Sequence, residues 1–192
     1  MIIDITPEVF LTFLIIFLLI GFAIYKKKEC DFRGWIIVAF AIYLLLLLKI
    51  TEFPIYIFSD EMLLDIRKAA GEYYNYYQIV PFSSIKNYFN DGAMIQLVGN
   101  VILLSPMVVF LEIFTRGRIN AFKEVIIVSA CSFVIEIIQL IVTIATKYPG
   151  HIADVDDLII NILGVVITVF AVKFFEEKKL AYGLVKKIIY KK

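Results

Sequence analysis

Five apolar stretches, each long enough to cross a lipid bilayer, decide what this chain can fold into. About 20 consecutive apolar residues span the hydrocarbon core as a helix, and these stretches cover residues 9–25, 34–50, 94–114, 124–145 and 158–175. The chain is 61% hydrophobic, with a mean hydropathy of +0.89, whereas soluble domains are about half apolar. The sequence therefore predicts an all-α fold, a polytopic membrane helical bundle with five transmembrane helices. Because basic residues follow the first stretch and no cleavage site is evident, we expect it to remain in the mature protein.

The apolar stretches divide a single domain into four segments. Residues 1–55 hold two N-terminal transmembrane helices, 56–93 form an amphipathic and tyrosine-rich segment, 94–175 hold three more helices, and 176–192 form a basic tail. Within the second segment, residues 59–70 begin with acids and then place apolar side chains at helical spacing. This pattern predicts a short helix lying on the membrane surface.

Basic residues are distributed unevenly between the two sides of the predicted bundle. The connectors 26–33 and 115–123 and the tail are rich in lysine and arginine. The opposite side has only Lys49, Arg67, Lys68, Lys86 and Lys147. Cytoplasmic loops carry an excess of basic residues, so the sequence predicts the N-terminus outside and the C-terminus inside. The segment 56–93 is then extracellular.

Polar side chains lie within or beside the last three apolar stretches. We take as candidate ligand-binding residues Asn100, Ser132, Glu136, Gln139, Asp154, Asp156, Asp157 and Asn161. At 1.5 Å per residue, Asn100 lies about 9 Å and Glu136 about 13 Å from the outer ends of their helices. A carboxylate within a membrane is costly and marks a functional site by default. We therefore expect a polar pocket that opens to the outside or to the outer leaflet.

Helical spacing places these side chains on two faces. Glu136 shares a face with Ser132 and Gln139, and Asp157 shares a face with Asn161 and Gly164, which permits close helix approach. We expect the two faces to pack against each other. The donors available to the Glu136 carboxylate are Gln139, Asn100, Asn161, His151 and Lys147.

Simpler interpretations exist for several of these residues. Asn100 and Asn161 are also typical of interhelical hydrogen bonds without further function, and His151 is typical of a surface loop. Asp154 or Asp156 is suited to cap the fifth helix. The carboxylates of Asp154, Asp156 and Asp157 also resemble the oxygen ligands of a divalent cation. Since such acids are common at helix starts, we assign no metal and expect no cofactor.

Four segments carry a resemblance to a known family. They are residues 78–85 (QIVPFSSI), 100–106 (NVILLSP), 132–139 (SFVIEIIQ) and 153–164 (ADVDDLIINILG). In this order and spacing they resemble the VanZ-like family of bacterial membrane proteins, over about residues 75–175. The chain departs from the family pattern at Gln78 (usually asparagine), at Val108 (usually glycine) and at His151 (commonly arginine). The last difference replaces a permanent cation with a titratable group.

The resemblance implies a multi-pass protein of the bacterial plasma membrane. The family is named for a protein that raises resistance to teicoplanin in Gram-positive bacteria. We therefore expect a non-catalytic envelope protein whose outward pocket binds an amphiphile or a cell-wall lipid and so modulates sensitivity to teicoplanin-type lipoglycopeptides. The expected partners are membrane lipids and a lipoglycopeptide or cell-wall lipid, with no nucleic acid; the oligomeric state is open.

Two other functions remain as alternatives. A membrane enzyme acting on a lipid-linked envelope substrate would use Glu136, Asp157 or His151 as the catalytic group, but no nucleophile elbow, HExxH or glycine-rich phosphate loop is present. A small proton-coupled transporter would use Glu136, but the sequence has no visible internal repeats. We favour the non-catalytic function.

Overall fold

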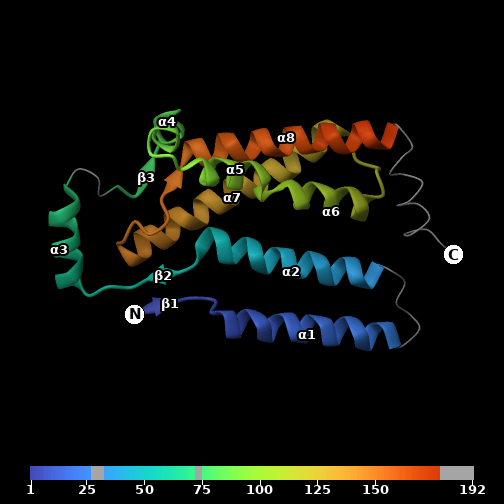
Figure 1. The fold of residues 1–192 in the computed structure, drawn as a ribbon, viewed down its shortest axis with the longest axis horizontal. Helices are drawn as coiled ribbons and strands as arrows, with labels where there is room; N and C mark the ends of the chain where they lie inside the picture. Colours follow the sequence, from blue (N-terminus) through green and yellow to red (C-terminus); the bar gives the residue numbers. More distant parts are fainter. Residues whose placement is uncertain (27–32, 72–74, 178–192) are drawn as a thin grey trace.

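The computed structural model describes residues 1–26, 33–71 and 75–177 and is built almost entirely of helices (Figure 1). The longer helices are α1 (Pro7–Lys26), α2 (Arg33–Glu52), α5 (Met94–Leu103), α6 (Ser105–Thr115), α7 (Ala121–Thr146) and α8 (Val155–Glu177). The shorter elements are α3 (Asp60–Ala70), α4 (Ser83–Asn90), β1 (Ile2–Ile3), β2 (Ile55–Tyr56), β3 (Tyr77–Gln78) and β4 (Ala153–Asp154). The predicted all-α class is confirmed.

Four helical segments are long and apolar enough to cross a membrane. They are Gly34–Glu52, Met94–Thr115, Ala121–Thr146 and Val155–Phe175. In α1 the apolar helical segment Pro7–Phe22 is shorter. The protein is thus a helical membrane bundle with four candidate spans among its described residues.

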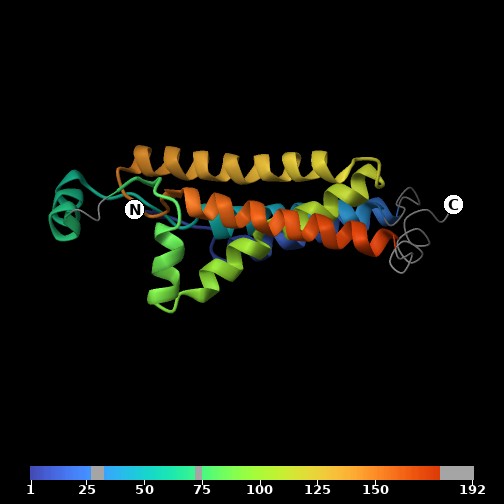
Figure 2. The ribbon, with the colours of Figure 1, turned by 90° about the horizontal axis from the view of Figure 1, so that it is seen from above.

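The third span is broken between α5 and α6, and Figure 2 shows the bend. Leu104 separates the two helices with φ −97° and ψ 0°. Pro106 stands in the first turn of α6 and lacks the N–H that would bond to Ile102. The hydroxyl of Tyr43 on α2 donates a hydrogen bond to the carbonyl of Leu103 at a distance of 3.1 Å. Pro106 thus interrupts the hydrogen-bond ladder of the span, and a neighbouring helix satisfies part of it.

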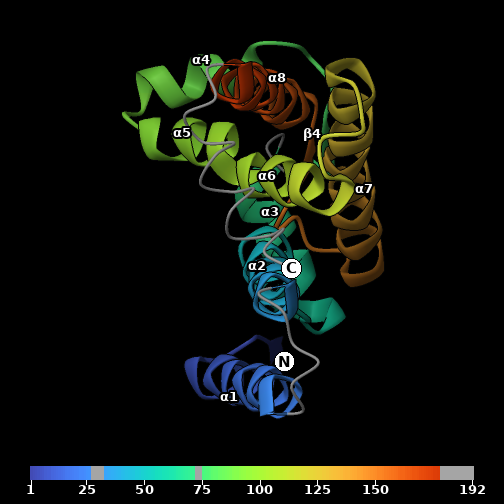
Figure 3. The same cartoon turned by 90° about the vertical axis from the view of Figure 1, so that its right-hand side faces the viewer.

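Helix α8 is the centre of the bundle. It packs against α5, α6 and α7, while α2 packs against α6 and α7, and α1 packs against α2. Seen along the bundle, α1 lies furthest from the other helices, beyond α2 (Figure 3). The buried apolar core contains Leu47, Leu104, Val108, Val128, Ile135, Val165 and Val169. Val108, where the family usually has glycine, is fully buried in this core.

The segments predicted on one side of the membrane gather at one end of the bundle. Helices α3 and α4 and strands β3 and β4 lie at one end, and the α6–α7 turn and the end of α8 lie at the other (Figure 1). Most of the basic connector and of the tail, residues 27–32 and 178–192, lies outside the described residues. The predicted helix α3 is present and is capped by the Ser59 hydroxyl, which accepts from the Met62 N–H over 3.4 Å.

Helix α4 was not predicted from the sequence. The two-residue parallel pairing of β3 with β4 sets Tyr77 opposite Ala153 and Gln78 opposite Asp154. The chain from β3 therefore runs beside the start of α8 before it enters α4. This contact brings the polar residues of the segment 78–88 to the acids of α8.

Candidate functional site

The carboxylate of Asp156, a residue of α8, accepts hydrogen bonds from the start of α4. Its Oδ1 accepts from the Phe82 N–H at 2.6 Å, and its Oδ2 accepts from the N–H groups of Ser84 at 2.8 Å and Ile85 at 3.2 Å. Phe82 has a left-handed φ of 67° and gives α4 no side-chain cap of its own. The fully buried Asp156 carboxylate therefore satisfies the free donors and the positive end of a helix remote in sequence.

Asp154 caps α8, which is one of the two roles expected for these acids. Its Oδ1 accepts from the Asp156 N–H at 2.8 Å, and its Oδ2 accepts from the Ser84 hydroxyl at 2.5 Å. Gln78, which replaces the asparagine of the family, donates to Oδ1 at 3.5 Å. Burial raises the pKa of the Asp154 carboxyl. Asp154 and Asp156 are thus structural acceptors that join three segments of the chain.

Glu136 is bonded by the main chain rather than by the expected side chains. Its Oε2 accepts from the backbone N–H of Asp154 at 2.8 Å. Four of the five expected donors bond elsewhere. Gln139 Nε2 donates to the Thr51 carbonyl of α2 at 3.1 Å, Lys147 pairs with Asp60 at 3.2 Å, and Asn100 and Asn161 donate to other side chains. The main-chain donor could not be recognised from helical spacing, since it comes from the loop that enters α8.

Asp157 and Gly164 of α8 lie against α5 rather than against the expected face of α7, although α7 and α8 themselves pack closely together. Asp157 Oδ1 accepts from Asn100 Nδ2 at 2.6 Å and from the Tyr88 hydroxyl at 3.2 Å. Burial and the nearby Asp157 carboxylate raise the pKa of Tyr88, so its hydroxyl stays protonated as a donor. Only Asn161 makes the expected contact with α7, donating to the Ser132 hydroxyl at 3.0 Å.

A cavity of about 700 Å³ lies between α2, α5, α7 and α8. Its polar lining comprises Thr51, Tyr88, Gln96, Asn100, Glu136, Gln139, His151, Asp157 and Asn161. Five of the eight candidate ligand-binding residues thus line one space. Ser132, Asp154 and Asp156 do not line it and instead form hydrogen bonds with residues around it. Thr51, Tyr88 and Gln96 were missed, because Thr51 and Gln96 stand at the ends of apolar stretches and Tyr88 belongs to α4, which was not predicted.

All three candidate catalytic residues, Glu136, Asp157 and His151, line this cavity. His151 is half-buried, and its carbonyl accepts from the Thr143 hydroxyl at 2.6 Å. Burial lowers the pKa of its imidazole, which favours the neutral form. The His151 side chain therefore lies in the lining of the cavity rather than in an exposed surface loop.

The structure brings no metal-binding group together among the residues it describes. No set of three or more His, Cys, Asp or Glu side chains in the described ranges is arranged to hold an ion. Asp154 and Asp156 instead accept the hydrogen bonds given above, and these occupy the oxygens that a cation would need.

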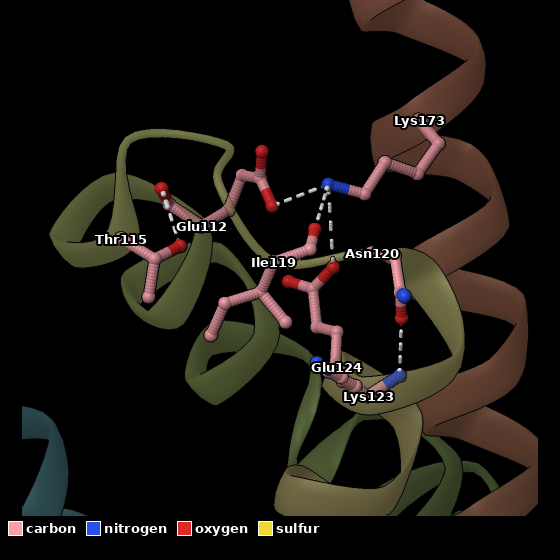
Figure 4. A network of polar contacts seen from close by, with 7 residues as sticks. All are labelled: Glu112, Thr115, Ile119, Asn120, Lys123, Glu124 and Lys173. Atoms are coloured by element: carbon pink, nitrogen blue, oxygen red, sulfur yellow. Dashed lines mark hydrogen bonds and ion pairs between the residues drawn. The ribbon is translucent and has the colours of Figure 1, made fainter.

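A second buried polar cluster lies at the other end of the bundle (Figure 4). Lys173 Nζ of α8 lies 2.6 Å from Glu112 Oε2 and 3.5 Å from Glu124 Oε2. Glu124 is fully buried, and Glu112 is 8% exposed. This cluster was not predicted from the sequence, because its three residues stand near the ends of three different apolar stretches.

These features define a multi-pass helical membrane protein with a polar cavity at one end of its bundle. The family model described as VanZ/LLP1 matches residues 40–176, and the chain belongs to this family. The match starts within α2, so it includes the helix that supplies Leu47 and Thr51 to the cavity, beyond the region 75–175 that carried the motifs. Comparisons with curated proteins and with solved structures gave no match.

Proposed function

We propose that this protein is an integral protein of the bacterial plasma membrane that accepts an amphiphile or a cell-wall lipid in the cavity. Through this binding it modulates the sensitivity of the cell to teicoplanin-type lipoglycopeptides. The proposal includes α1 as a fifth transmembrane helix, with the N-terminus outside and the C-terminus inside. The cavity then lies in the outer half of the membrane.

The division of the cavity into a polar and an apolar part carries the proposal. Its apolar wall includes four residues of α2 and α5 with large exposed fractions: Leu46 (41%), Ile50 (63%), Ile95 (84%) and Ile102 (56%). Side chains so exposed within apolar helices would face lipid, whereas Glu136 and Gln139 lie deep in the bundle. An amphiphile that enters between α2 and α5 would place its hydrocarbon chain against this wall and its headgroup beside the polar residues. This match with an amphiphile favours a lipid-like ligand.

Drug susceptibility of a strain that depends on this protein for resistance tests the proposal. We expect Glu136→Gln and Asp157→Asn to lower the inhibitory concentration of teicoplanin toward that of the deletion strain. Asp65→Asn, at an exposed carboxylate of α3, is the matched control and should leave it unchanged. Membrane levels of each variant would be measured by immunoblot. Unchanged susceptibility of both cavity variants at normal protein levels would refute the proposed role of the cavity.

The enzyme alternative has one specific observation in its favour. Glu136, Asp157 and His151 line the same cavity, so two carboxyl groups and an imidazole could act on one bound substrate. Lipid and cell-wall precursor profiles of the deletion strain distinguish this function. A substrate that accumulates on deletion and also in Glu136→Gln would favour catalysis, whereas unchanged profiles would favour binding alone.

A further inference from the structure

Two of the residues that line the polar end of the cavity carry an unpaired buried acceptor. The side-chain oxygens Gln139 Oε1 and Asn161 Oδ1 are buried and have no hydrogen-bond partner among the described residues. Gln139 is 9% exposed and Asn161 is 2% exposed. Leaving a buried acceptor unpaired is unfavourable, because the acceptor has lost its hydrogen bonds to water. Gln139 and Asn161 both line the cavity, so the described residues leave two acceptor oxygens beside it without a donor.

The carboxyl groups of the cavity add further acceptor capacity. Glu136 uses Oε2 for the Asp154 N–H, and Asp157 uses Oδ1 for Asn100 and Tyr88. The other oxygen of each group takes no hydrogen bond found among the described residues. Even a protonated carboxyl retains an acceptor oxygen. The polar end can thus receive several donated hydrogen bonds at once.

The same lining offers few groups that would stabilise a bound anion. No lysine or arginine is among the described residues that line the cavity. His151 is the only basic side chain there, and burial disfavours its charged form. A phosphate headgroup would meet Glu136 and Asp157 with no cation to offset the repulsion between like charges. An ammonium or a set of sugar hydroxyls would instead supply donors to the oxygens of Gln139, Asn161, Glu136 and Asp157.

We propose that the cavity selects amphiphiles whose headgroup donates hydrogen bonds and rejects those with a phosphate headgroup. This inference rests on the proposed amphiphile-binding function and names its ligand class. An amine or a sugar would supply the donors, and both share this chemistry. The alkyl chain would lie along Ile95 and Ile102 of α5.

Photo-crosslinking of the full-length protein in phosphatidylcholine nanodiscs tests the inference. Three probes with the same diazirine-bearing dodecyl chain would carry an amine, a glucoside or a phosphate headgroup. Labelling would be mapped by mass spectrometry to peptides containing residues 46–51 and 94–103, and competed with unlabelled probe. We expect saturable labelling by the amine, the glucoside or both, at least tenfold above that by the phosphate. If the amine probe labels more strongly, an amine supplies the donors; if the glucoside probe labels more strongly, a sugar supplies them.

Each other outcome contradicts a different claim. Labelling by the phosphate probe equal to that by the others would overturn the headgroup selection and leave amphiphile binding intact. Saturable labelling by none of the probes would overturn the proposed binding function itself. As a second measurement, Glu136→Gln should reduce labelling by the amine at least tenfold, with Asp65→Asn unchanged. If folded Glu136→Gln is labelled by the amine as strongly as the wild type, the Glu136 carboxylate does not contribute to recognition of the headgroup.

Discussion

Gly164 lies directly against the backbone of Val101. A Cβ built on Gly164 would stand 1.9 Å from the Val101 carbonyl oxygen and 2.7 Å from its carbonyl carbon. Helices α8 and α5 can approach this closely only because Gly164 has no side chain. The contact lies one residue along α5 from Asn100, which bonds to Asp157. The closeness of these two backbones therefore supports the polar end of the cavity.

Replacing Gly164 by alanine should destabilise the bundle. The added methyl group meets backbone, which cannot rotate away, and overpacking of this kind costs about 1–3 kcal/mol. Gly99→Ala on α5 is the control, since a Cβ there meets nothing within 4 Å. Thermal unfolding in detergent should show a lower Tm for Gly164→Ala and little change for Gly99→Ala. Equal Tm values for the two variants would contradict the close contact.

Asp156→Ala should loosen α4 more than α8. The change leaves three N–H groups at the start of α4 without their acceptor, at a cost of about 1–3 kcal/mol for a buried donor. Hydrogen exchange should become faster over Ser83–Asn90 than in the middle of α8. Asp91→Asn, an exposed acid at the end of α4, is the control. Unchanged exchange in α4 would show that Asp156 is not its cap.

Lys173→Met should be one of the most damaging single changes. It leaves the buried carboxyl groups of Glu112 and Glu124 without the ammonium that lies beside both. Removing one partner of a buried ion pair costs about 3–5 kcal/mol. Adding Glu112→Gln and Glu124→Gln to Lys173→Met should restore much of the Tm. Lys68→Met at an exposed pair should have little effect, and failure of the triple variant to recover would show that lost packing of Lys173 dominates.

The stability of the protein should depend on pH through His151. Burial lowers the pKa of this imidazole below its ordinary 6.5, so the unfolded chain takes up the proton at higher pH than the folded protein. The contribution of His151 to stability is therefore present above pH 6.5 and is lost as the pH falls through 6.5 to its folded pKa. Between about pH 7.5 and 5.5, the Tm of the wild type should fall more steeply than that of His151→Gln. Asp154, whose pKa is raised, acts in the opposite direction in both proteins, so parallel curves would exclude the His151 contribution.

Cysteine labelling tests the proposed orientation. In a background with Cys30 and Cys131 replaced by serine, single cysteines would be placed at Glu61 of α3 and at Arg118 between α6 and α7. Both positions are exposed, and they lie toward opposite ends of the bundle (Figure 1). A membrane-impermeant maleimide should label Glu61→Cys in intact cells and Arg118→Cys only after lysis. The reverse pattern would invert the proposed topology.

The sequence by itself determined the long helices and several of the polar residues that line the cavity. Apolar length, helical spacing and the break at Pro106 are properties of neighbouring residues, so they could be recognised without knowledge of the fold. The same local signals placed Glu136 and Asn161 on inward helix faces. Five of the predicted residues line one space, whereas what that space binds stays a prediction.

Only the tertiary structure decided which groups satisfy each other. Phe82 and Asp156 are 74 positions apart, and Asn100 and Asp157 are 57 apart. Helix α4 depends on that remote cap, and Lys173 meets its two glutamates only when α6, α7 and α8 are packed together. Hydrogen bonds and ion pairs act over about 3 Å, so they depend on how helices are placed in space. Spacing along one helix shows which face a side chain is on, but packing selects the partner that the face meets.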